Sequence, residues 1–504
     1  MRTGFLRIVL VQLVAIFCIS PATAESQVRS DRVEQLRLIL NAFIPSAIES
    51  VKSAPGIGIA VTGPEGLIYA NGFGYADVES RIPVTPDTLF YIASTTKSLT
   101  TTVAAVLEAD GRLDLNASAI QYLPELAYTA ALKDHDITLV DLLSCSFGHQ
   151  NNEAFEYRTA YSGDYSRARL IEIFGASVTS DTSFEYTNTG FIVASMILDD
   201  LEESGSWKDS VDRIVLKPLN MTHTTGYVSN TKDLPIAVGY SYRGGLQRLR
   251  FAKLDSTMHA AGGHFSSARD LARWVQVNMN RGRIDDIQYI PENVMDRVHT
   301  QYTEVDTRFY KYRRYGYELG WYRSDYEGDL LVHDFGSYPG YRSHISYMPE
   351  HGIGVAVLTN GYAGSFFLVD VIANYAYDVL LGKDNLAEKY AKELGDVVAM
   401  RERRDSGIDK SNAKFLDYSP GAAQYAGVYE NSQFGRIVIT AGADSLHASF
   451  GVLSSTLRPY GSTNKFIEEL VPGSLNLVIF DKLESGQMTL NLGSELYVRT
   501  AQAM

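Results

Sequence analysis

The stretch Ser94-Thr95-Thr96-Lys97 stands where an extended, turn-rich run gives way to an amphipathic helical pattern. On a helix, positions i and i+3 share a face with Cβ atoms about 5–6 Å apart, so the Lys97 amine can reach the Ser94 hydroxyl. An amine there can help to take the proton from Ser94 Oγ, and the backbone N–H groups at a helix start favour negative charge developing nearby. The four residues therefore form a candidate nucleophilic centre.

The Ser-x-x-Lys pattern is not specific by itself, because it recurs at Ser229, Ser411 and Ser462. Only Ser94 is followed by a clear helical period of apolar residues, which ends at the stop signal Asp110-Gly111. The other matches lie in segments rich in Asn, Asp, Gly or Pro. Context therefore selects Ser94, and the alternative for this tetrad is a helix-capping serine with a solvated lysine.

Length and composition limit the class of protein. At 504 residues, the chain exceeds a typical single domain, so we expect two. A content of 45% hydrophobic and 21% charged residues is that of an ordinary globular protein. The formal charge of -14 and the pI of about 5.2 argue against a nucleic-acid partner.

Residues 1–24 have the composition of a secretory signal peptide. Arg2 and Arg7 supply positive charge, residues 8–19 form the apolar core, and residues 22–24 are small, as a cleavage site requires. The apolar stretch is shorter than the roughly 20 residues that a membrane-spanning helix needs. We therefore expect a mature protein that begins near Glu25, is secreted or periplasmic, and has no stable membrane span.

Short strand-like runs lie near both ends of the first 380 residues, with helical patterns between them. The runs are residues 56–62, 66–70, 329–332, 342–348 and 354–359. This order predicts an α/β (α+β) fold, in which an antiparallel sheet built from N- and C-terminal pieces is flanked by helices and carries an inserted helical subdomain. We expect this first domain to cover residues 25–382.

The remainder of the chain divides into two parts. Residues 383–414 are charged and helical in pattern, which is typical of a solvated linker. From Phe415 onwards, short strand patterns follow one another at close spacing, separated by Gly, Asn and Asp turns. We therefore predict a small antiparallel, lipocalin-like β-barrel over residues 415–504.

Tyr186-Thr187-Asn188, just before another helical pattern, is a second candidate element. Burial destabilises a phenolate and a neighbouring ammonium stabilises it, so a tyrosine beside a lysine can share one mobile proton with it. The Asn188 amide could donate to a substrate carbonyl. This signal is also weak alone, because Tyr429-Glu430-Asn431 matches it in the C-terminal β region.

Together with their flanks, these elements resemble the class C β-lactamase and penicillin-binding-protein-like serine hydrolases, a family that includes D-aminopeptidases, DD-peptidases and family VIII esterases. The resemblance spans roughly residues 57–381. It rests on stretches that follow one another in the family's order: Phe73-Gly-Tyr-Ala-Asp77, Pro83-Val-Thr-Pro-Asp87, Gly111-Arg-Leu-Asp-Leu115, Leu142-Leu-Ser-Cys-Ser-Phe-Gly148, Ser267-Ala-Arg-Asp-Leu-Ala-Arg-Trp274, Tyr315-Gly-Tyr-Glu-Leu-Gly-Trp321 and Val357-Leu-Thr-Asn360.

The resemblance implies a role for each residue of the two elements. Ser94 would be the nucleophile, Lys97 its proton partner, Tyr186 the general base and later the acid, and Asn188 a contact to substrate or to Lys97. The implied chemistry is acyl transfer through Ser94, without a metal or organic cofactor, on a small-molecule or peptide substrate.

The family's third element departs from its usual form. The family carries Lys-Thr-Gly, or His-x-Gly, on the strand that lines the site, whereas this chain has His333-Asp334-Phe335-Gly336-Ser337. Either Asp334 stands at the basic position, or His333 does and a bulge absorbs one extra residue. An Asp there would repel a substrate carboxylate. We favour His333, with Gly336 and Ser337, as the substrate-binding set.

The absence of this lysine argues against a dedicated β-lactamase, because in the family the lysine typically recognises the substrate carboxylate. We therefore expect an exported serine hydrolase that cleaves an amide or peptide bond through a Ser94 acyl-enzyme. The alternatives are an ester hydrolase or a β-lactamase with the same site and, from a different class, a penicillin-binding sensor or scaffold without turnover. The oligomeric state stays open.

Overall fold

The computed structural model describes residues 21–128, 136–149, 153–203, 205–362, 364–412 and 414–501. The predicted signal segment, 1–24, lies outside the described residues except for its last four, which begin helix α1 (Pro21–Val51). Among the described helices, none is both long enough and apolar enough to cross a membrane.

A nine-stranded antiparallel sheet forms the centre of the larger part of the molecule, in the order β10-β11-β12-β13-β14-β15-β1-β2-β3. Strand β1 (Gly56–Gly63) pairs with β2 (Gly66–Asp77) on one side and with β15 (Ile353–Thr359) on the other. N- and C-terminal segments thus share one sheet, as expected. The other strands are β3 (Ile82–Pro83), β10 (Thr303–Phe309), β11 (Tyr312–Tyr317), β12 (Tyr322–Tyr326), β13 (Asp329–Tyr338) and β14 (Tyr341–Met348).

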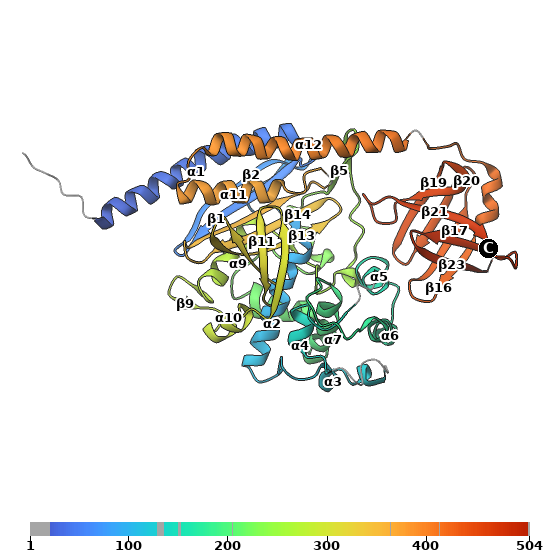
Figure 1. Cartoon of the computed structure of the whole chain (residues 1–504), viewed down its shortest axis with the longest axis horizontal. Coiled ribbons are helices and arrows are strands. Elements are labelled where there is room, and N and C mark those ends of the chain that lie inside the picture. Colours follow the sequence, from blue (N-terminus) through green and yellow to red (C-terminus); the bar gives the residue numbers. More distant parts are fainter. Residues whose placement is uncertain are drawn as a thin grey trace, which may run out of the picture.

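Helices cover both faces of this sheet (Figure 1). Helices α1, α11 (Leu368–Leu381) and α12 (Leu386–Asn412) lie together on one face, where alternate β1 residues such as Ile57 and Ile59 join their apolar core. Helices α2 (Thr96–Ala109) and α9 (Ala268–Met279) lie on the other face, where Ala60 packs. Because successive side chains of a strand point to opposite faces, β1 serves both cores and is buried throughout.

A helical subdomain is inserted between β3 and β10, as the sequence pattern predicts. Its helices are α3 (Ala119–Tyr122), η2 (Pro124–Tyr128), α4 (Leu139–Leu143), α5 (Glu153–Glu156), η4 (Tyr157–Ser162), α6 (Arg167–Ser177), α7 (Thr189–Leu201), α8 (Trp207–Val211), η5 (Asp212–Leu216), η6 (Val228–Thr231), η7 (Asp255–Thr257) and α10 (Glu292–Val298). The short strands of this region are β4 (Phe90–Tyr91), β5 (Tyr240–Tyr242), β6 (Leu246–Arg248), β7 (Phe265–Ser266), β8 (Arg283–Ile284) and β9 (Ile287–Gln288).

Helix α2 is buried along most of its length, although its first half is rich in polar residues. The hydroxyls are satisfied by backbone carbonyls of neighbouring segments: Thr100 donates to Ala260 O at 2.8 Å and Thr101 to Leu319 O at 2.9 Å. Trp274 Nε1 donates to Ser98 Oγ at 2.9 Å. Buried polar groups with such partners fix the helix in one position relative to its surroundings.

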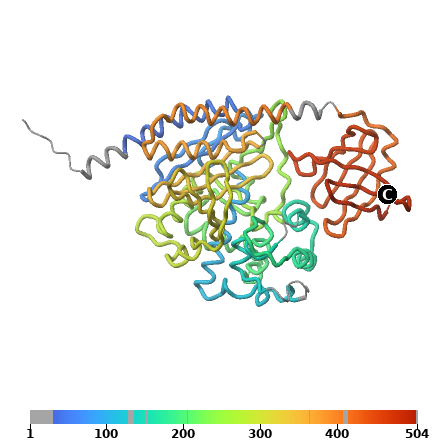
Figure 2. The backbone as a smooth tube through the Cα atoms, viewed as in Figure 1, coloured from blue at the N-terminus to red at the C-terminus, as the bar shows by residue number. Residues whose placement is uncertain are grey.

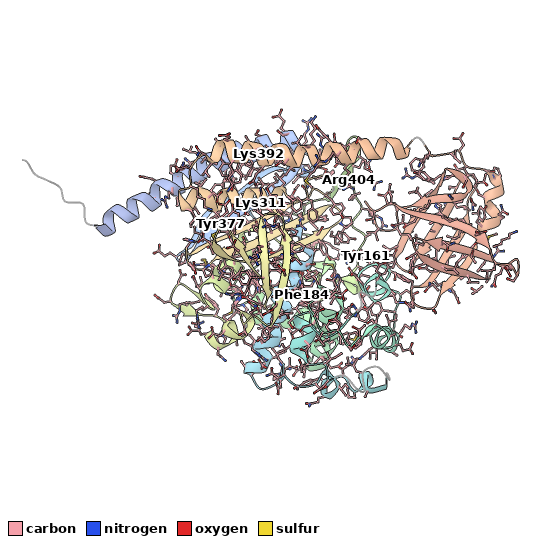
Figure 3. The ribbon with its side chains drawn as sticks, in the orientation of Figure 1. Tyr161, Phe184, Lys311, Tyr377, Lys392 and Arg404 are labelled. Carbon is pink, nitrogen blue, oxygen red and sulfur yellow. The ribbon has the colours of Figure 1, made fainter. Side chains whose placement is uncertain are left out.

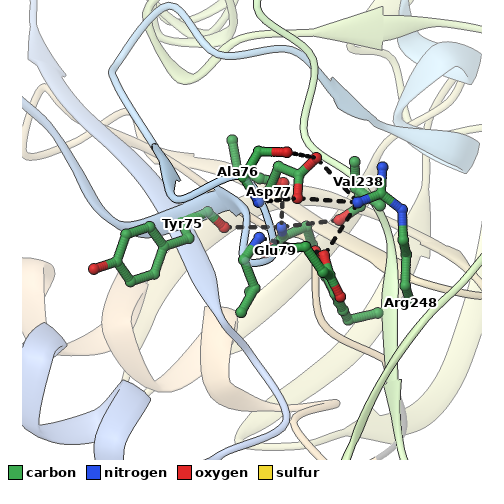
Figure 4. Close-up of polar contacts among 10 residues, drawn as sticks. Tyr75, Ala76, Asp77, Glu79, Val238 and Arg248 are labelled. Carbon is green, nitrogen blue, oxygen red and sulfur yellow. Dashed lines mark hydrogen bonds and ion pairs between the residues drawn. The ribbon is translucent and has the colours of Figure 1, made fainter.

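A polar cluster joins the end of β2 to the inserted subdomain (Figure 4). Arg248 Nη1 lies 3.0 Å from Asp77 Oδ1 and 3.1 Å from Glu79 Oε2. Beside it, Asn360 Nδ2 lies within hydrogen-bonding distance of the carbonyl oxygens of Tyr75, Ala76 and Val238. This one amide therefore ties the end of β15 to two other segments.

The C-terminal strands close into an eight-stranded antiparallel barrel, which Figure 2 shows set apart from the sheet and its helices. Strand β16 pairs with both β17 and β23, so the barrel has no open edge. The fold-class prediction, including a small barrel, is confirmed. The barrel elements are η8 (Pro420–Tyr425), β16 (Gly427–Asn431), β17 (Gly435–Ala441), β18 (Leu446–Phe450), β19 (Leu453–Tyr460), β20 (Ser462–Glu468), β21 (Asn476–Lys482), β22 (Met488–Leu492) and β23 (Glu495–Ala501).

The barrel docks on the segment α5–η4 of the inserted subdomain. The ring of Tyr157 packs against Phe450 with a centroid distance of 4.9 Å, and Arg158 Nε donates to the carbonyl of Gln433. Val452 N donates to Ser162 O at 2.8 Å. A cavity of about 200 Å³ remains at this contact, lined by Tyr157 and barrel residues.

Candidate active site

Ser94 lies in the tight turn η1 (Ala93–Thr95), which leads directly into α2. Ala93 has a φ of 46°, a left-handed conformation that a residue with a side chain rarely adopts. The turn is tied to the sheet, because Ser343 Oγ on β14 donates to Ile92 O at 2.8 Å and lies 2.9 Å from Thr95 Oγ1. A strained, well-anchored turn of this kind holds the half-buried Ser94 in a defined position.

Lys97 is completely buried in the first turn of α2. Its Nζ donates to Asn188 Oδ1 at 2.6 Å and to Ala261 O at 3.0 Å, and it lies 4.7 Å from the ring centre of Tyr186. Burial lowers the pKa of Lys97 to about 8, even though the nearby Asp334 carboxylate opposes the change. A substantial fraction of this amine is therefore neutral near pH 8 and able to accept a proton.

Tyr186 lies beside Lys97 and is enclosed by rings: it stacks on Tyr322 and Phe335 with centroid distances of 6.0 and 6.1 Å. Phe184, labelled in Figure 3, packs against the same ring of Tyr322. Burial, reinforced by the charge of Asp334, raises the pKa of the Tyr186 phenol well above its usual value, while hydrogen bonding with the nearby Ser94 opposes the rise. The Oη makes no well-aligned hydrogen bond within the described chain.

Asn188 uses its side-chain amide to bridge two groups. Its Oδ1 accepts from Lys97, and its Nδ2 donates to Glu156 Oε1 at 2.8 Å. The contact to Lys97, one of the two roles expected for Asn188, is thus present. Sequence reasoning missed Glu156: the residue lies 32 positions from Asn188 in a short polar helix, and no spacing pattern marks it.

Strand β13 forms the wall opposite Ser94. Strand β12 pairs with β13 only up to His333, so in the described part of the chain residues 334–338 have no strand neighbour on that edge. A Cβ added to Gly336 would lie 1.8 Å from Ile92 O, so only glycine allows β13 to approach η1 this closely. Ser337 is half-buried on the same stretch.

The alternation of side chains along β13 shows which residue of the third element faces the site. Leu331 joins the core under α1 and α11, whereas Val332 joins the core around α2 and α9. Asp334 and Gly336 therefore share the α2 face, and His333 points to the opposite face. His333 Nε2 lies 2.9 Å from Ser324 Oγ, and burial beside Arg314 lowers the pKa of His333 well below its usual value.

Our choice of His333 as the substrate-facing residue is therefore wrong. No bulge interrupts the pairing of β13 with β14 between Val332 and Tyr338. Without an extra residue to absorb, the strand keeps its register, and Asp334 stands at the position facing Lys97.

Asp334 is fully buried, and neither of its carboxylate oxygens has a well-aligned hydrogen-bond partner among the described residues. Burial raises the pKa of Asp334 to about 8, against the opposing effects of the Lys97 ammonium and the adjacent Phe335 amide. Lys97, Tyr186 and Asp334 thus form one buried group whose protonation states depend on one another.

Metal ligation has no visible basis in this neighbourhood. Within the described ranges, no three His, Cys, Asp or Glu side chains are grouped closely enough to hold a metal ion. What the arrangement provides is a serine hydroxyl beside a lysine amine and a phenol, which are groups suited to nucleophilic and acid–base chemistry.

Two known proteins illustrate what the sequence is similar to. Protein flp of Staphylococcus aureus (strain N315) is 24% identical over 319 residues, which cover 61% of this chain and 59% of that protein. The unguisins hydrolase ungD' of Aspergillus campestris is 26% identical over 373 residues, 68% of this chain and 67% of that protein. The chain thus spans about three fifths of the length of the Protein flp relatives that it matches.

A solved structure shares the fold. The octameric penicillin-binding protein homologue from Pyrococcus abyssi superposes with a TM-score of 0.58 at 23% identity, covering 91% of this chain and 99% of that one. The sequence also matches the family described as Beta-lactamase over residues 46–378, which is more than half of its length and contains every residue of the site described above. The chain therefore belongs to the Beta-lactamase family.

Proposed function

We propose that this protein is a serine hydrolase that forms an acyl-enzyme on Ser94. The observation that carries the proposal is the hydrogen-bonded, fully buried Lys97 one helical turn from Ser94, beside a Tyr186 phenol with no other well-aligned partner. A buried amine with a pKa of about 8 is a proton acceptor near neutral pH. The relative named unguisins hydrolase supports hydrolysis as the reaction class.

In the proposed mechanism, Ser94 Oγ attacks the substrate carbonyl carbon while its proton passes to Tyr186 Oη, whose own proton passes to the neutral amine of Lys97. The negative charge on the carbonyl oxygen is stabilised by backbone N–H groups of Ser94 and of the unpaired edge of β13. The leaving group departs with a proton from Tyr186, and water then attacks the acyl-enzyme with the same groups acting in reverse.

We propose an amide or peptide bond as the substrate, ahead of a carboxylic ester or a β-lactam. Support comes from Asp334, because a carboxylate in place of the family's lysine removes the attraction for the carboxylate that β-lactams carry. The unpaired edge of β13 could receive an extended peptide as an additional strand.

The nucleophile is tested by covalent labelling. A fluorophosphonate probe should label the wild type once, on the peptide that contains Ser94, and should not label Ser94→Ala. Ser98→Ala is a matched control, because Ser98 lies one turn further along α2 with its Oγ bound to Thr95 O. An inert wild type with a normal circular dichroism spectrum would exclude the enzyme.

Turnover is tested with a panel of p-nitrophenyl esters, D- and L-aminoacyl anilides and nitrocefin. Faster hydrolysis of the anilides than of nitrocefin supports a peptidase or amidase. Stable labelling without turnover of any member of the panel would instead favour a penicillin-binding sensor or scaffold.

We also propose export, through removal of residues 1–24. The support is compositional: the basic start, the apolar core and the small residues at 22–24. N-terminal sequencing of protein recovered from the medium or periplasm should begin near Glu25. A recovered protein that still carries residue 1 would contradict cleavage.

The domain boundaries are a further proposal, with residues 25–382 as the hydrolase domain, 383–414 as a linker and 415–504 as the barrel domain. The single helix α12 spans most of the linker, between the sheet-bearing part and the closed barrel. Tyr390 and Val397 of α12 are buried in the core shared with α1 and α11, whereas residues 402–404 are exposed. Limited proteolysis should therefore cut first in the second half of residues 383–414 and release two stable fragments.

A further inference from the structure

The strongest unexplained feature of the site is the Asp334 carboxyl. It is fully buried on the α2 face of β13, and no side chain or well-aligned backbone group in the described chain hydrogen-bonds to either oxygen. Buried polar groups are nearly always paired, so an orphaned carboxyl beside a candidate nucleophile indicates a group that a bound molecule completes.

The nearby cations are already engaged by other groups. Lys97 donates to Asn188 Oδ1 and Ala261 O rather than to Asp334. The guanidinium groups of Arg314 and Arg342 lie over the ring of Phe335, each 4.9 Å from its centre, and neither forms an ion pair with Asp334. The carboxyl therefore keeps its capacity to accept hydrogen bonds.

A second acid, Glu156, also acts on Lys97. Glu156 accepts from Asn188, and its negative charge acts on both Lys97 and the buried Lys253. Asn188 already engages Glu156, so Asp334 is the acid of this pair whose oxygens no side chain engages. When it is ionised, such a carboxyl attracts a cation.

Aromatic rings lie next to the lysine that Asp334 faces. The ring of Tyr186, whose centre is 4.7 Å from Lys97 Nζ, stacks on Tyr322 and Phe335, which also stack on each other. Ring faces attract cations, so these side chains favour the same kind of ligand as the carboxyl groups do.

We infer that Asp334 recognises a cationic end of the substrate, an ammonium close to the scissile carbonyl; this inference rests on the proposed acyl transfer at Ser94. The ammonium donates to the two free oxygens of Asp334 while the carbonyl lies against Ser94 and the unpaired edge of β13. Burial keeps the empty carboxyl close to neutral, and an arriving ammonium supplies the charge that favours its ionised form. A substrate carboxylate at this position favours the neutral form of Asp334 and forms no ion pair with it, so it lacks the stabilisation that an ammonium receives.

The test uses three alanine p-nitroanilides, in both D and L forms, on the full chain at pH 7: the free amine, its N-acetyl derivative and its N-succinyl derivative. For the wild type, kcat/KM should favour the free amine over the N-succinyl compound by about 100-fold, the scale of a close charge pair that one substrate forms and the other does not. Asp334→Asn, which keeps the size of the side chain, should reduce this ratio at least tenfold. Asp334→Lys should reverse it.

Asp329→Asn is the matched control, because it makes the same chemical change at the other, partly exposed end of β13, beside His351. It should leave the ratio unchanged. If Asp334→Asn slows all three substrates by the same factor, Asp334 acts only through Lys97 and the inference is overturned.

A second readout separates this inference from the proposed function. Alanine amide should protect Ser94 from a fluorophosphonate in the wild type more effectively than N-succinylalanine amide, and Asp334→Asn should remove the difference. An unlabelled Ser94 defeats the proposed function, whereas a labelled Ser94 without differential protection defeats only the role of Asp334.

Discussion

Glu156 accepts a 2.8 Å hydrogen bond from the Asn188 amide whose oxygen, in turn, holds Lys97. Glu156 is the last residue of α5, and the next residue, Tyr157, packs against Phe450 of the barrel. The segment that receives the barrel is thus also the segment that orients the Asn188 amide next to Lys97.

Glu156→Ala should lower kcat about tenfold, since Asn188 loses the partner that fixes its orientation and Lys97 loses part of its alignment. Steady-state kinetics on the best substrate of the panel measure the change. Glu153→Ala, an exposed position on the same short helix, is the control and should behave as wild type. Equal values of kcat for Glu156→Ala and wild type would show that the hydrogen bond from Asn188 to Glu156 does not affect the reaction.

Tyr186→Phe should slow acylation of Ser94 by about 10²–10⁴-fold, the range typical of a general acid–base group. The rate of fluorophosphonate labelling gives the value directly. Tyr317→Phe is a matched control, because Tyr317 is a neighbouring buried tyrosine whose Oη also has no partner among the described residues. If both variants react at the wild-type rate, Tyr186 is not the base.

The labelling rate should rise with pH through about 8, because the neutral form of Lys97 is the one that accepts a proton. Asp334→Asn should move the midpoint to lower pH, since the Asp334 carboxylate stabilises the Lys97 ammonium and raises its pKa. A pH series from 6 to 10 with a neutral probe measures both midpoints. An unchanged or higher midpoint in the variant would contradict the coupling.

The burial of Lys97 also affects the stability of the folded protein. Because the folded pKa of Lys97 lies below the unfolded value of 10.5, the charged lysine destabilises the fold fully below pH 8, and the effect disappears as pH rises towards 10.5. A shift of this size corresponds to an energy on the order of 3 kcal/mol. Lys97→Met should therefore unfold at a higher temperature than wild type at pH 7, with a smaller difference at pH 10. A difference that grows with pH would contradict this account.

Gly336→Ala should destabilise the protein by about 1–3 kcal/mol, the usual effect of overpacking, because the new methyl group meets Ile92 O. It should also slow labelling of Ser94, since the turn η1 has to move. The control is Gly395→Ala in α12, where a Cβ meets no atom within 4 Å and helix propensity favours alanine. Chemical denaturation measures the free energy of unfolding of both variants. Equal destabilisation by Gly336→Ala and Gly395→Ala would show that the close approach of β13 to η1 does not require glycine.

Much of the fold could be predicted from local pattern. The apolar period after Ser94 corresponds to α2, and the strand-like runs at 56–62 and 354–359 became the paired strands β1 and β15. The sequence analysis also identified the closely spaced strands of the barrel. These features depend on periodicity within a short window, which the residues themselves display.

The errors concern contacts that depend on more than one segment. Successive side chains of β13 point to opposite faces of the sheet, so one assumed insertion decides whether His333 or Asp334 faces the site. The link between Glu156 and Asn188 depends on how α5 packs against α7, and no pattern in either segment encodes that packing.

The pairing of β1 with β15 also orders the events of folding. Thr359 Oγ1 donates to Gly56 O across 303 residues, so the centre of the sheet cannot be completed until nearly three quarters of the chain is present. Distant pairings of this kind form slowly, because a long loop has to close before the contacts are made. The barrel, whose neighbouring strands follow one another along the chain, can form by successive hairpins. During synthesis, the β1–β2 hairpin therefore keeps one edge unpaired until β15 has been made. The chain is most prone to aggregation during that interval.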